Sequence, residues 1–407
     1  MIELYEHQKR IVEKNPKKSG LWHQLGTGKT ITALALAKKN NIEVLIVVPK
    51  PVRRKWHKAM VDMQVEGLIM SREEFRKMAP TMRGDKFKGL IIDESHFGFC
   101  SLKAQLHKKT KWFIKQWHIE YVWLLTGTVY TSSAWSVYGA AQLLGVNWNY
   151  RSFQERFFQP RWLGARMIWE PKAGTQEDLA ACVRSIGDVV RLDNCADIPE
   201  QTVEVEYFEK TKEQEAAEKY VKEDESNPLV RTTKYHQIAS GVKIGTEFTG
   251  DEFFDSKKND RIIEYAEENP KLVVFSRYNI HLDVLSKMLT EKKIPHAIVN
   301  GKTEDKEVIF EQAEKSERFV LLINAACSVG YELPSFGVVL FASLSYSFVD
   351  YSQAQGRVLR INALKKNLYI IMLTEGSVDE AVWESIGNKK SFNDTIFSSV
   401  ELTKYER

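Results

Sequence analysis

A glycine-rich turn that runs directly into a helix-forming segment is the stretch of this sequence most able to do chemistry. Residues 25–30 read LGTGKT and an Ala/Leu-rich run follows them, a composition that favours a helix. Such a turn directs backbone N–H groups and a helix N-terminus at one point, where a phosphate binds. We expect Lys29 to reach the β- and γ-phosphates of a nucleotide and Thr30 to ligate Mg²⁺. The expected phosphate contacts are Gly26, Thr27, Gly28, Lys29 and Thr30.

The phosphate-loop pattern is incomplete, because His23 stands where its first glycine is expected. A chance turn before a helix is therefore an alternative. An apolar run over residues 89–92 that ends in Asp93 and Glu94 favours the nucleotide interpretation. Such a run predicts a buried parallel strand that delivers carboxylates to its C-terminal edge, where α/β sheets bind ligands. Asp93 would hold Mg²⁺ and Glu94 would polarise the attacking water, although a strand followed by an acidic turn has the same pattern.

A third stretch supplies the cations that a nucleotide site needs. Gln353, Arg357 and Arg360 are spaced four and three residues apart, so a helix would place them on one face. A solvated basic helix face is the alternative. Taken together, a phosphate cradle, a metal-and-water site and a pair of arginine fingers predict a nucleoside triphosphatase.

At these residues the sequence resembles superfamily-two helicase motors and, among them, the Swi/Snf-type DNA translocases. Residues 93–96 are a variant of the Asp-Glu-x-His box, and residues 353–361 resemble the arginine motif of that group. Its members also often lack the first glycine of the phosphate loop. The resemblance extends from Leu4 to about Lys390 and implies a minimal, virus- or bacterium-like motor that uses ATP and Mg²⁺.

The resemblance also implies roles for residues outside these motifs. They are Gln8 for adenine recognition, Gly330 for nucleotide contact, Lys50, Arg53, Arg54 and Ser71 for the nucleic-acid backbone, and His96, Thr126 and Thr128 for coupling hydrolysis to DNA movement. Five cations in residues 50–58 suit phosphate contacts, with a solvated helix face as the alternative. Glu332 stands where the group often has asparagine, which weakens the resemblance around Gly330.

Composition limits the class of protein. A chain of 407 residues suits two domains, and a net charge of +4 requires any nucleic-acid surface to be a local patch. Four cysteines without a CxxC pair predict neither zinc nor disulfides. We find no apolar run near the ~18 residues of a membrane span and no signal peptide. We therefore expect a monomer in the cytoplasm of a prokaryotic cell or a virus-infected host cell.

The alternation of strand-like and helix-like segments predicts an α/β fold. The resemblance implies two RecA-like lobes, each a mostly parallel sheet with helices on both faces, and an ATP cleft between them. We expect an N-terminal lobe over residues 1–200, a short helical linker over 201–255 and a C-terminal lobe over 256–407. Trp112 and Trp117 lie beside Phe113 and Ile114, which favours one buried helix face over stacking on bases.

The expected partner is duplex DNA, because the arginine motif resembles that of motors that track intact duplexes. The interval from Gly145 to Asp255 is short for a strand-separating hairpin or domain, so we expect little unwinding. A strand-separating DNA or RNA helicase on the same lobes is the second hypothesis. A non-catalytic nucleic-acid clamp is the third, and five retained residues argue against it: Lys29, Asp93, Glu94, Arg357 and Arg360.

Overall fold

The computed structural model describes residues 3–128, 133–192, 195, 201–245, 250–327, 331–358 and 366–398, with only the backbone described for residues 163 and 390–398. Contacts divide the chain into two compact units, the first comprising residues 1–197 and 389–407 and the second residues 198–388. Each unit contains a six-stranded parallel sheet. The predicted α/β fold with two RecA-like sheets is confirmed.

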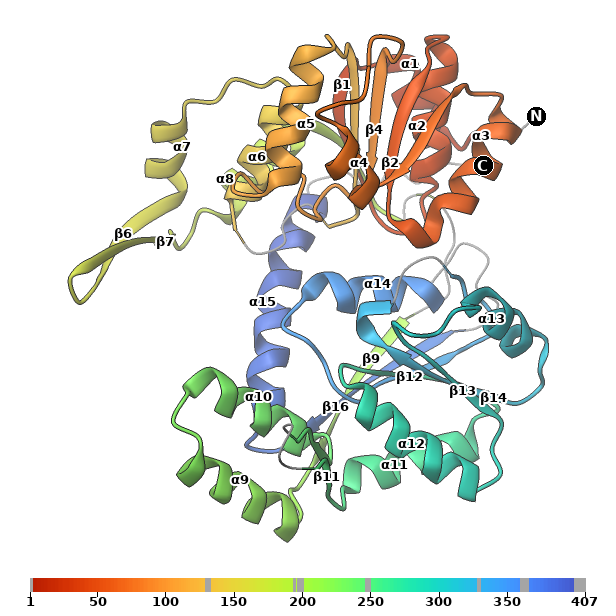
Figure 1. Cartoon of the computed structure of the whole chain (residues 1–407), viewed down its shortest axis with the longest axis vertical. Coiled ribbons are helices and arrows are strands. Elements are labelled where there is room, and N and C mark those ends of the chain that lie inside the picture. Colours follow the sequence, from red (N-terminus) through yellow and green to blue (C-terminus); the bar gives the residue numbers. More distant parts are fainter. Residues whose placement is uncertain are drawn as a thin grey trace. The chain divides into compact units, whose positions relative to one another are not determined.

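The sheet of the first unit has the strand order β3-β2-β4-β5-β1-β8 (Figure 1). Its strands are β1 (Lys18–His23), β2 (Val44–Val48), β3 (Gly67–Ser71), β4 (Gly89–Asp93), β5 (Tyr121–Leu125) and β8 (Gly187–Val190). The helices are α1 (Glu6–Lys14), α2 (Lys29–Lys39), the 3₁₀ turn η1 (Lys50–Val52), α3 (Arg53–Met63), α4 (Arg72–Met78), α5 (Gln105–Gln116), α6 (Trp135–Leu143), α7 (Tyr150–Phe157) and α8 (Gln176–Ser185).

Continuous apolar strands in this unit are explained by helices on both faces of the sheet. Along β2, Leu45 and Val47 enter one hydrophobic cluster, whereas Val44, Ile46 and Val48 enter the cluster on the opposite face. Helices α1, α2 and α3 contribute to the second cluster, and α4, α5, α6 and α8 contribute to the first. When a strand is buried on both faces, its residues do not alternate between apolar and polar types.

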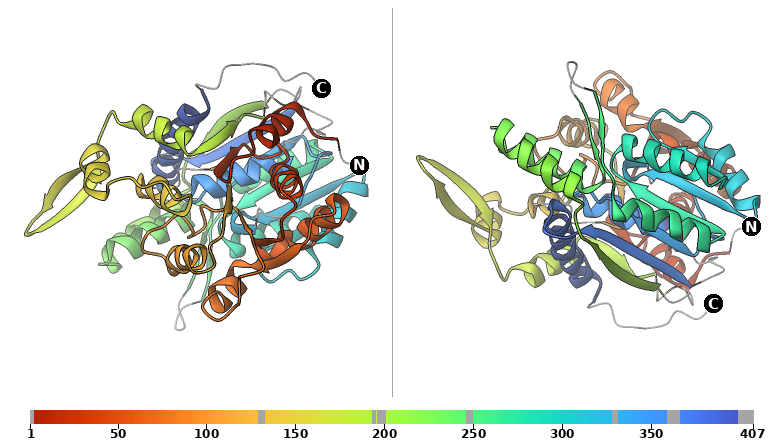
Figure 2. Two further views of the ribbon diagram at one scale, coloured as in Figure 1. Left: turned by 90° about the horizontal axis from the view of Figure 1, so that it is seen from above. Right: turned by 90° about the horizontal axis from the view of Figure 1, so that it is seen from below.

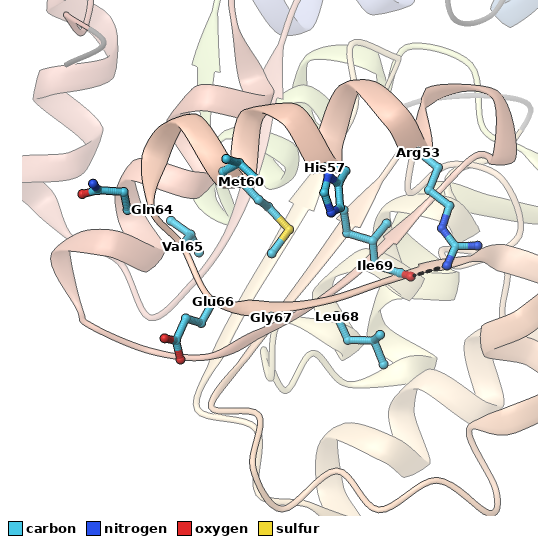
Figure 3. Close-up of a pocket in the computed structure, with 10 residues that line it drawn as sticks. Arg53, His57, Met60, Gln64, Val65, Glu66, Gly67, Leu68 and Ile69 are labelled. Carbon is cyan, nitrogen blue, oxygen red and sulfur yellow. Dashed lines mark hydrogen bonds between the residues drawn. The ribbon is translucent and has the colours of Figure 1, made fainter.

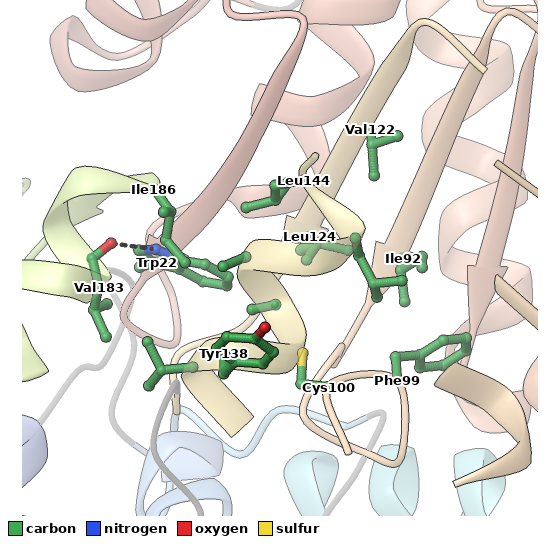
Figure 4. Close-up of a cluster of buried hydrophobic side chains, with 14 of the residues drawn as sticks. Trp22, Ile92, Phe99, Cys100, Val122, Leu124, Tyr138, Leu144, Val183 and Ile186 are labelled. Carbon is green, nitrogen blue, oxygen red and sulfur yellow. Dashed lines mark hydrogen bonds between the residues drawn. The ribbon is translucent and has the colours of Figure 1, made fainter. Parts of the chain in front are cut away.

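Trp22 of β1 anchors the first of these clusters (Figure 4). Its indole is fully buried, and Nε1 donates a hydrogen bond to the Val183 carbonyl of α8 at 3.1 Å. A Cβ at Gly20 or Gly187 would overlap the indole, so glycine at both positions makes room for it. The indole thereby fixes β1, and with it the turn that follows, against the rest of the unit.

The sheet of the second unit has the order β13-β14-β12-β15-β16-β9. Its strands are β9 (Gln201–Phe208), β12 (Lys271–Ser276), β13 (His296–Val299), β14 (Phe319–Asn324), β15 (Val338–Phe341) and β16 (Asn367–Thr374). The other elements are α9 (Lys212–Asp224), α10 (Pro228–Ala239), the short pair β10 (Val242–Lys243) and β11 (Glu252–Phe253), α11 (Lys257–Glu268), α12 (Asn279–Glu291), α13 (Lys306–Lys315), the 3₁₀ turn η2 (Ala325–Cys327), α14 (Phe348–Val358) and α15 (Val378–Ser398).

A buried ion pair lies inside the second unit. Lys258 Nζ lies 2.6 Å from Asp379 Oδ2, and His236 Nε2 lies 3.2 Å from Asp379 Oδ1. Burial by itself would raise the pKa of Asp379, but Lys258 and His236 outweigh burial and hold that pKa below its ordinary value. The carboxylate is therefore ionised and joins helices α10, α11 and α15.

Three expectations about the arrangement of the chain differ from the structure, two of them fully and one in part. Residues 201–208 are not part of a linker but form β9, which pairs with β16 along its whole length. The interval after Gly145 does contain a prominent hairpin, formed by β6 (Phe158–Leu163) and β7 (Arg166–Pro171). The expected buried face of α5 is right for Phe113, which is buried, and for Ile114 and Trp117, which pack against the core. Trp112 is exposed instead, because adjacent helical residues point in different directions. Among the described residues, no helix is long and apolar enough to cross a bilayer.

Candidate active site

Three adjacent strands bring the predicted catalytic motifs to one edge of the first sheet. Strand β5 lies between β4 and β1, and all three run parallel. The carboxyl ends of β1, β4 and β5 therefore place the phosphate loop, Asp93-Glu94 and Thr126 side by side. This is the edge at which open α/β sheets bind ligands.

The phosphate loop has a preformed backbone. Gly26 and Gly28 both have positive φ angles, 89° and 78°, a conformation that favours glycine. A Cβ on Gly28 would lie 2.6 Å from Gln8 Nε2, so any larger residue would also have to displace the Gln8 amide. Lys29 Nζ donates to the His23 and Gln24 carbonyls at 2.9 and 3.0 Å. The ammonium group therefore already lies inside the turn that would receive phosphates.

Helix α1 supports this loop through two side chains. His7 Nε2–H donates to the Thr27 carbonyl at 2.9 Å, and burial lowers the pKa of His7 to about 4, so the ring is neutral at neutral pH. Gln8 Nε2 donates to the Gly28 carbonyl at 3.1 Å, while Gln8 Oε1 accepts from Tyr5 N at 3.0 Å. The Gln8 amide thus contacts the phosphate loop, and its expected pairing with adenine stays a prediction.

His23, which replaces the usual first glycine, belongs to a buried polar network. Its Nε2 lies 3.0 Å from Asp188 Oδ2, and Arg10 Nη2 lies 2.8 Å from both oxygens of that carboxylate. Burial lowers the pKa of His23, so a neutral ring donates to the ionised Asp188. Sequence reasoning missed this network, because 165 residues separate His23 from Asp188 and no local pattern connects them.

The predicted metal-binding carboxylate is held by two donors. Asp93 Oδ2 accepts from Trp56 Nε1 at 2.8 Å, and Oδ1 accepts from Glu94 N at 3.0 Å. Burial, followed by the charge of Glu94, raises the pKa of Asp93 to about 6. A carboxylate and the Thr30 hydroxyl are hard oxygen ligands of the kind that Mg²⁺ prefers, so the donor set fits that ion. Each carboxylate oxygen keeps a lone pair for it.

Glu94 and His96 connect the acidic motif to Thr126. Glu94 has a φ of 49°, in the left-handed region, where a non-glycine residue at a ligand-binding edge is a sign of function. His96 Nδ1 lies 3.4 Å from Glu94 Oε2 and 2.7 Å from Thr126 Oγ1. The Thr126 hydroxyl in turn donates to the Thr128 carbonyl at 3.1 Å. Burial lowers the pKa of His96 to about 3, so a neutral imidazole links the two strand ends.

The residues predicted to contact nucleic acid divide into two groups. Lys50, Arg53 and Arg54 are all exposed, and Arg53 bonds to Glu74 at 3.0 Å and to the Ile69 carbonyl at 3.1 Å (Figure 3). That second bond crosses one end of a groove of about 720 Å³ between α3 and β3. Ser71 is buried and caps α4 by accepting from Glu74 N, so its hydroxyl already has a structural role.

Helix α14 carries the predicted finger residues of the second unit. Gln353 and Arg357 are both buried, at 3% and 6% exposure, which rules out the solvated-face alternative for them. Arg357 Nη1 donates to the Tyr331 carbonyl at 3.4 Å, and its guanidinium lies 5.8 Å from the centre of the Tyr331 ring. Arg360 and Gly330 lie outside the described residues, so their roles stay predictions.

Known proteins resemble this chain in both units. Residues 257–362 match the helicase conserved C-terminal domain family. The SWI/SNF-related matrix-associated actin-dependent regulator of chromatin subfamily A-like protein 1 of Drosophila melanogaster is 21% identical over 90% of this chain and 52% of its own length. The Bos taurus protein of that name is 25% identical over 94% of this chain and 44% of its own length. The ATP-dependent helicase fft2 of Schizosaccharomyces pombe is 26% identical over 45% of this chain and 15% of its own length.

The two sheets, the phosphate loop and the matched C-terminal domain are similar to those of superfamily-two helicase ATPases. Two of the relatives are named SWI/SNF-related proteins. The chain spans about half the length of the two subfamily A-like relatives that it matches most fully.

Proposed function

We propose that this chain hydrolyses ATP with Mg²⁺ in order to move along DNA, and that its track is the duplex. One observation carries the proposal: Lys29, the Asp93-Glu94 pair and Thr126 occupy the ends of three adjacent parallel strands. The relatives support ATP-dependent action on nucleic acid, because one of them is named an ATP-dependent helicase.

The proposed division of work follows from the chemistry of each side chain. Lys29 neutralises the β- and γ-phosphates, Thr30 and Asp93 hold Mg²⁺, and Glu94 orients the attacking water. Bound Mg²⁺ supplies charge neutralisation on the phosphate oxygens. Arg357 and Arg360 stabilise the charge that develops on the transferred phosphoryl group, with Gln353 beside them. Gln8 and Gly330 complete the nucleotide contacts.

Movement requires that the phosphate site sense the nucleic acid. The contacts from Glu94 to His96 and from His96 to Thr126 offer a route for such sensing. A change in water or phosphate at Glu94 would alter the hydrogen bond that positions the segment after β5. Lys50, Arg53 and Arg54 would contact the backbone phosphates, which gives affinity without sequence preference.

The first experiment is a panel of ATPase assays with covalently closed duplex DNA, single-stranded DNA and single-stranded RNA. The proposal expects the largest stimulation with the closed duplex, since a duplex tracker needs no end or gap. Stimulation by RNA alone, or by no nucleic acid, would overturn it.

A strand-separating helicase is the second candidate, and the β6–β7 hairpin favours it because a strand separator needs a wedge. A duplex that carries a third strand in triplex form tests movement, and a forked duplex with a labelled strand tests separation. Displacement of the third strand without release of the forked strand supports the duplex translocase. Efficient release from the fork without triplex displacement identifies the strand-separating helicase instead.

A further inference from the structure

The β6–β7 hairpin is an arm that projects from the first unit and belongs to neither face of the sheet (Figures 1 and 2). Its two strands pair only with each other, with Phe158 opposite Pro171 and Leu163 opposite Arg166. An isolated two-stranded ribbon has marginal stability in water. A ribbon of this kind therefore needs packing contacts at its base, and its extended tip calls for a functional explanation.

Aromatic packing anchors the base of the arm. Phe158 is only 3% exposed and stacks on Trp135 of α6 with ring centres 4.7 Å apart. Trp135 also stacks on Tyr150 of α7 at 4.8 Å, and Lys172 N donates to the Phe157 carbonyl at 2.9 Å. The arm therefore leaves the unit from a fixed base.

The pairing register gives the arm two unlike faces. Residues opposite each other in an antiparallel pair lie on the same face, and every second pair shares that face. One face carries Phe158, Pro160, Trp162, Met167, Trp169 and Pro171, and the other carries Gln159, Arg161, Arg166, Ile168 and Glu170. The first face is wholly apolar, although it covers no core of this unit beyond Phe158.

Exposure of the apolar face increases toward the tip. Trp169 is 38% exposed, Met167 44% and Trp162 67%. Trp162 and Met167 lie opposite each other, and Trp169 belongs to the neighbouring pair on the same face of the ribbon. Singly exposed apolar residues need no explanation, but a contiguous apolar patch marks a binding site. Two tryptophans suit a flat, polarisable partner, because their rings stack at a small cost in conformational entropy.

The charge of the arm indicates which partner that is. Over residues 158–172, Arg161, Arg166 and Lys172 stand against Glu170, which leaves a net charge of +2. Arg161 is bonded to Glu170 at 3.1 Å, whereas Arg166 lies exposed beside the turn. Tryptophan faces that accompany cations are the combination with which proteins bind unpaired nucleic acid.

We propose that Trp162 and Trp169 stack on bases at an interruption of the duplex, such as the junction of a fork. An intact duplex presents phosphates and groove edges, and its base faces become accessible only where stacking ends or is broken. The arm therefore recognises the place at which a duplex opens, while the sheet edge of the proposed motor acts on the intact part. This inference rests on the proposed function, because it assumes that nucleic acid is the track.

The test compares the full chain with the double variant Trp162→Ala/Trp169→Ala. Binding is measured by fluorescence anisotropy to a fork and to a closed circular duplex, with 2-aminopurine at the fork junction as a reporter of stacking. At the lower end of measured stacking strengths, two lost stacks reduce fork affinity roughly 30-fold. Affinity for the closed duplex and the ATPase rate that it stimulates should stay unchanged, and the 2-aminopurine signal should lose its protein-dependent change.

Two control variants sharpen this comparison. Trp112→Ala removes an exposed tryptophan of α5 outside the arm and should change neither affinity. Trp162→Phe/Trp169→Phe keeps an aromatic face and should retain most of the preference for the fork. Equal losses on the fork and on the closed duplex, or no loss on either, would overturn the inference.

Three further outcomes separate the arm from the motor. If sedimentation shows that the wild-type chain self-associates and the double variant does not, while fork binding is unchanged, the apolar face binds a second copy and the inference is wrong. If no nucleic acid stimulates the wild-type ATPase, the proposed function fails. If closed duplex stimulates it but the two tryptophans have no effect, only the role of the arm fails.

Discussion

The indole of Trp56 donates a hydrogen bond to the Asp93 carboxylate, with 2.8 Å between Nε1 and Oδ2. Trp56 lies in α3, the helix that carries the basic segment, and its side chain is fully buried. One side chain thus connects the candidate DNA-binding segment to the candidate Mg²⁺ ligand. Displacement of α3 by a bound backbone would move the donor that orients Asp93.

Trp56→Phe should therefore lower kcat for ATP hydrolysis roughly 10- to 100-fold, because a hydrogen bond to a charged group contributes about 1.5–3 kcal/mol. The Mg²⁺ concentration for half-maximal activity should rise, which a purely structural role would not produce. Trp123→Phe is the matched control, since the buried Trp123 donates a similar bond to the Pro16 carbonyl, which precedes β1 and lies away from the carboxyl ends of the strands. A loss of thermal stability in both variants without a change in Mg²⁺ dependence would refute the role of Trp56.

Lys29→Ala should abolish ATP hydrolysis while the fold remains, because the ammonium serves phosphates and its present partners are two loop carbonyls. Steady-state turnover at saturating ATP, with circular dichroism for the fold, measures both effects. Lys39→Ala is the control, as Lys39 lies on the same helix and also donates to backbone carbonyls. Retention of most of the turnover by the Lys29 variant would contradict the phosphate-loop assignment.

Arg360→Ala should reduce hydrolysis far more than ATP binding, because a finger acts on charge that develops in the transition state. Arginine fingers raise the rate of hydrolysis roughly 10³- to 10⁵-fold, so the loss of even a partial contribution should lower that rate about 100-fold. Single-turnover hydrolysis and equilibrium binding of a fluorescent ATP analogue separate the two effects. Arg357→Ala should behave alike but also lose stability, since Arg357 is buried against Tyr331. Unchanged turnover with weaker ATP binding would show that the substituted arginine contacts ATP in the ground state and does not act as a finger.

Arg53→Ala/Arg54→Ala should weaken DNA binding uniformly across sequences and flatten its dependence on salt. Each lost phosphate contact changes the log–log slope by about 0.9 on duplex DNA. If the slope changes by the amount for one contact, Arg53 stays bound to Glu74 in the complex. If it changes by the amount for two contacts, DNA displaces Glu74 from Arg53. The control is Arg83→Ala/Lys86→Ala, which removes two exposed cations of the same unit. An unaltered slope would indicate that the basic segment is a solvated helix face and does not contact DNA phosphates.

Asp379→Asn should destabilise the second unit by about 3–5 kcal/mol, because it leaves the buried Lys258 ammonium without its counter-charge. The pKa of Asp379 is lowered in the fold, so its contribution to stability is complete above the ordinary carboxylate pKa and is lost as pH falls from there through the lowered pKa of the folded state. Urea midpoints of the two proteins, measured from pH 7 to pH 2, should stay apart down to about pH 4 and approach each other below it. The control Lys258→Met/Asp379→Leu should recover much of the loss. A constant difference across this range would contradict the ion-pair explanation.

The sequence by itself determined the motifs whose parts are adjacent along the chain. Gly26 to Thr30 need only a turn and the helix after it, and Asp93-Glu94 need only the end of an apolar strand. Gln353 and Arg357 follow from helical spacing. Such local patterns also identified the alternating elements, and hence the α/β class, because strand and helix periods repeat within a few residues, whereas the two RecA-like lobes were implied by the resemblance.

Only the tertiary structure decided what surrounds those motifs. The partnership of His23 with Asp188, the bond from Trp56 to Asp93 and the register that gathers Trp162 and Trp169 on one exposed face all depend on how separate segments meet. Residues 201–208 were misassigned for the same reason, because their exposed, charged alternation became a strand only through pairing with β16. Packing against distant partners overrides local preference in such cases, since a contact across many residues leaves no signal in the short range that a sequence pattern samples.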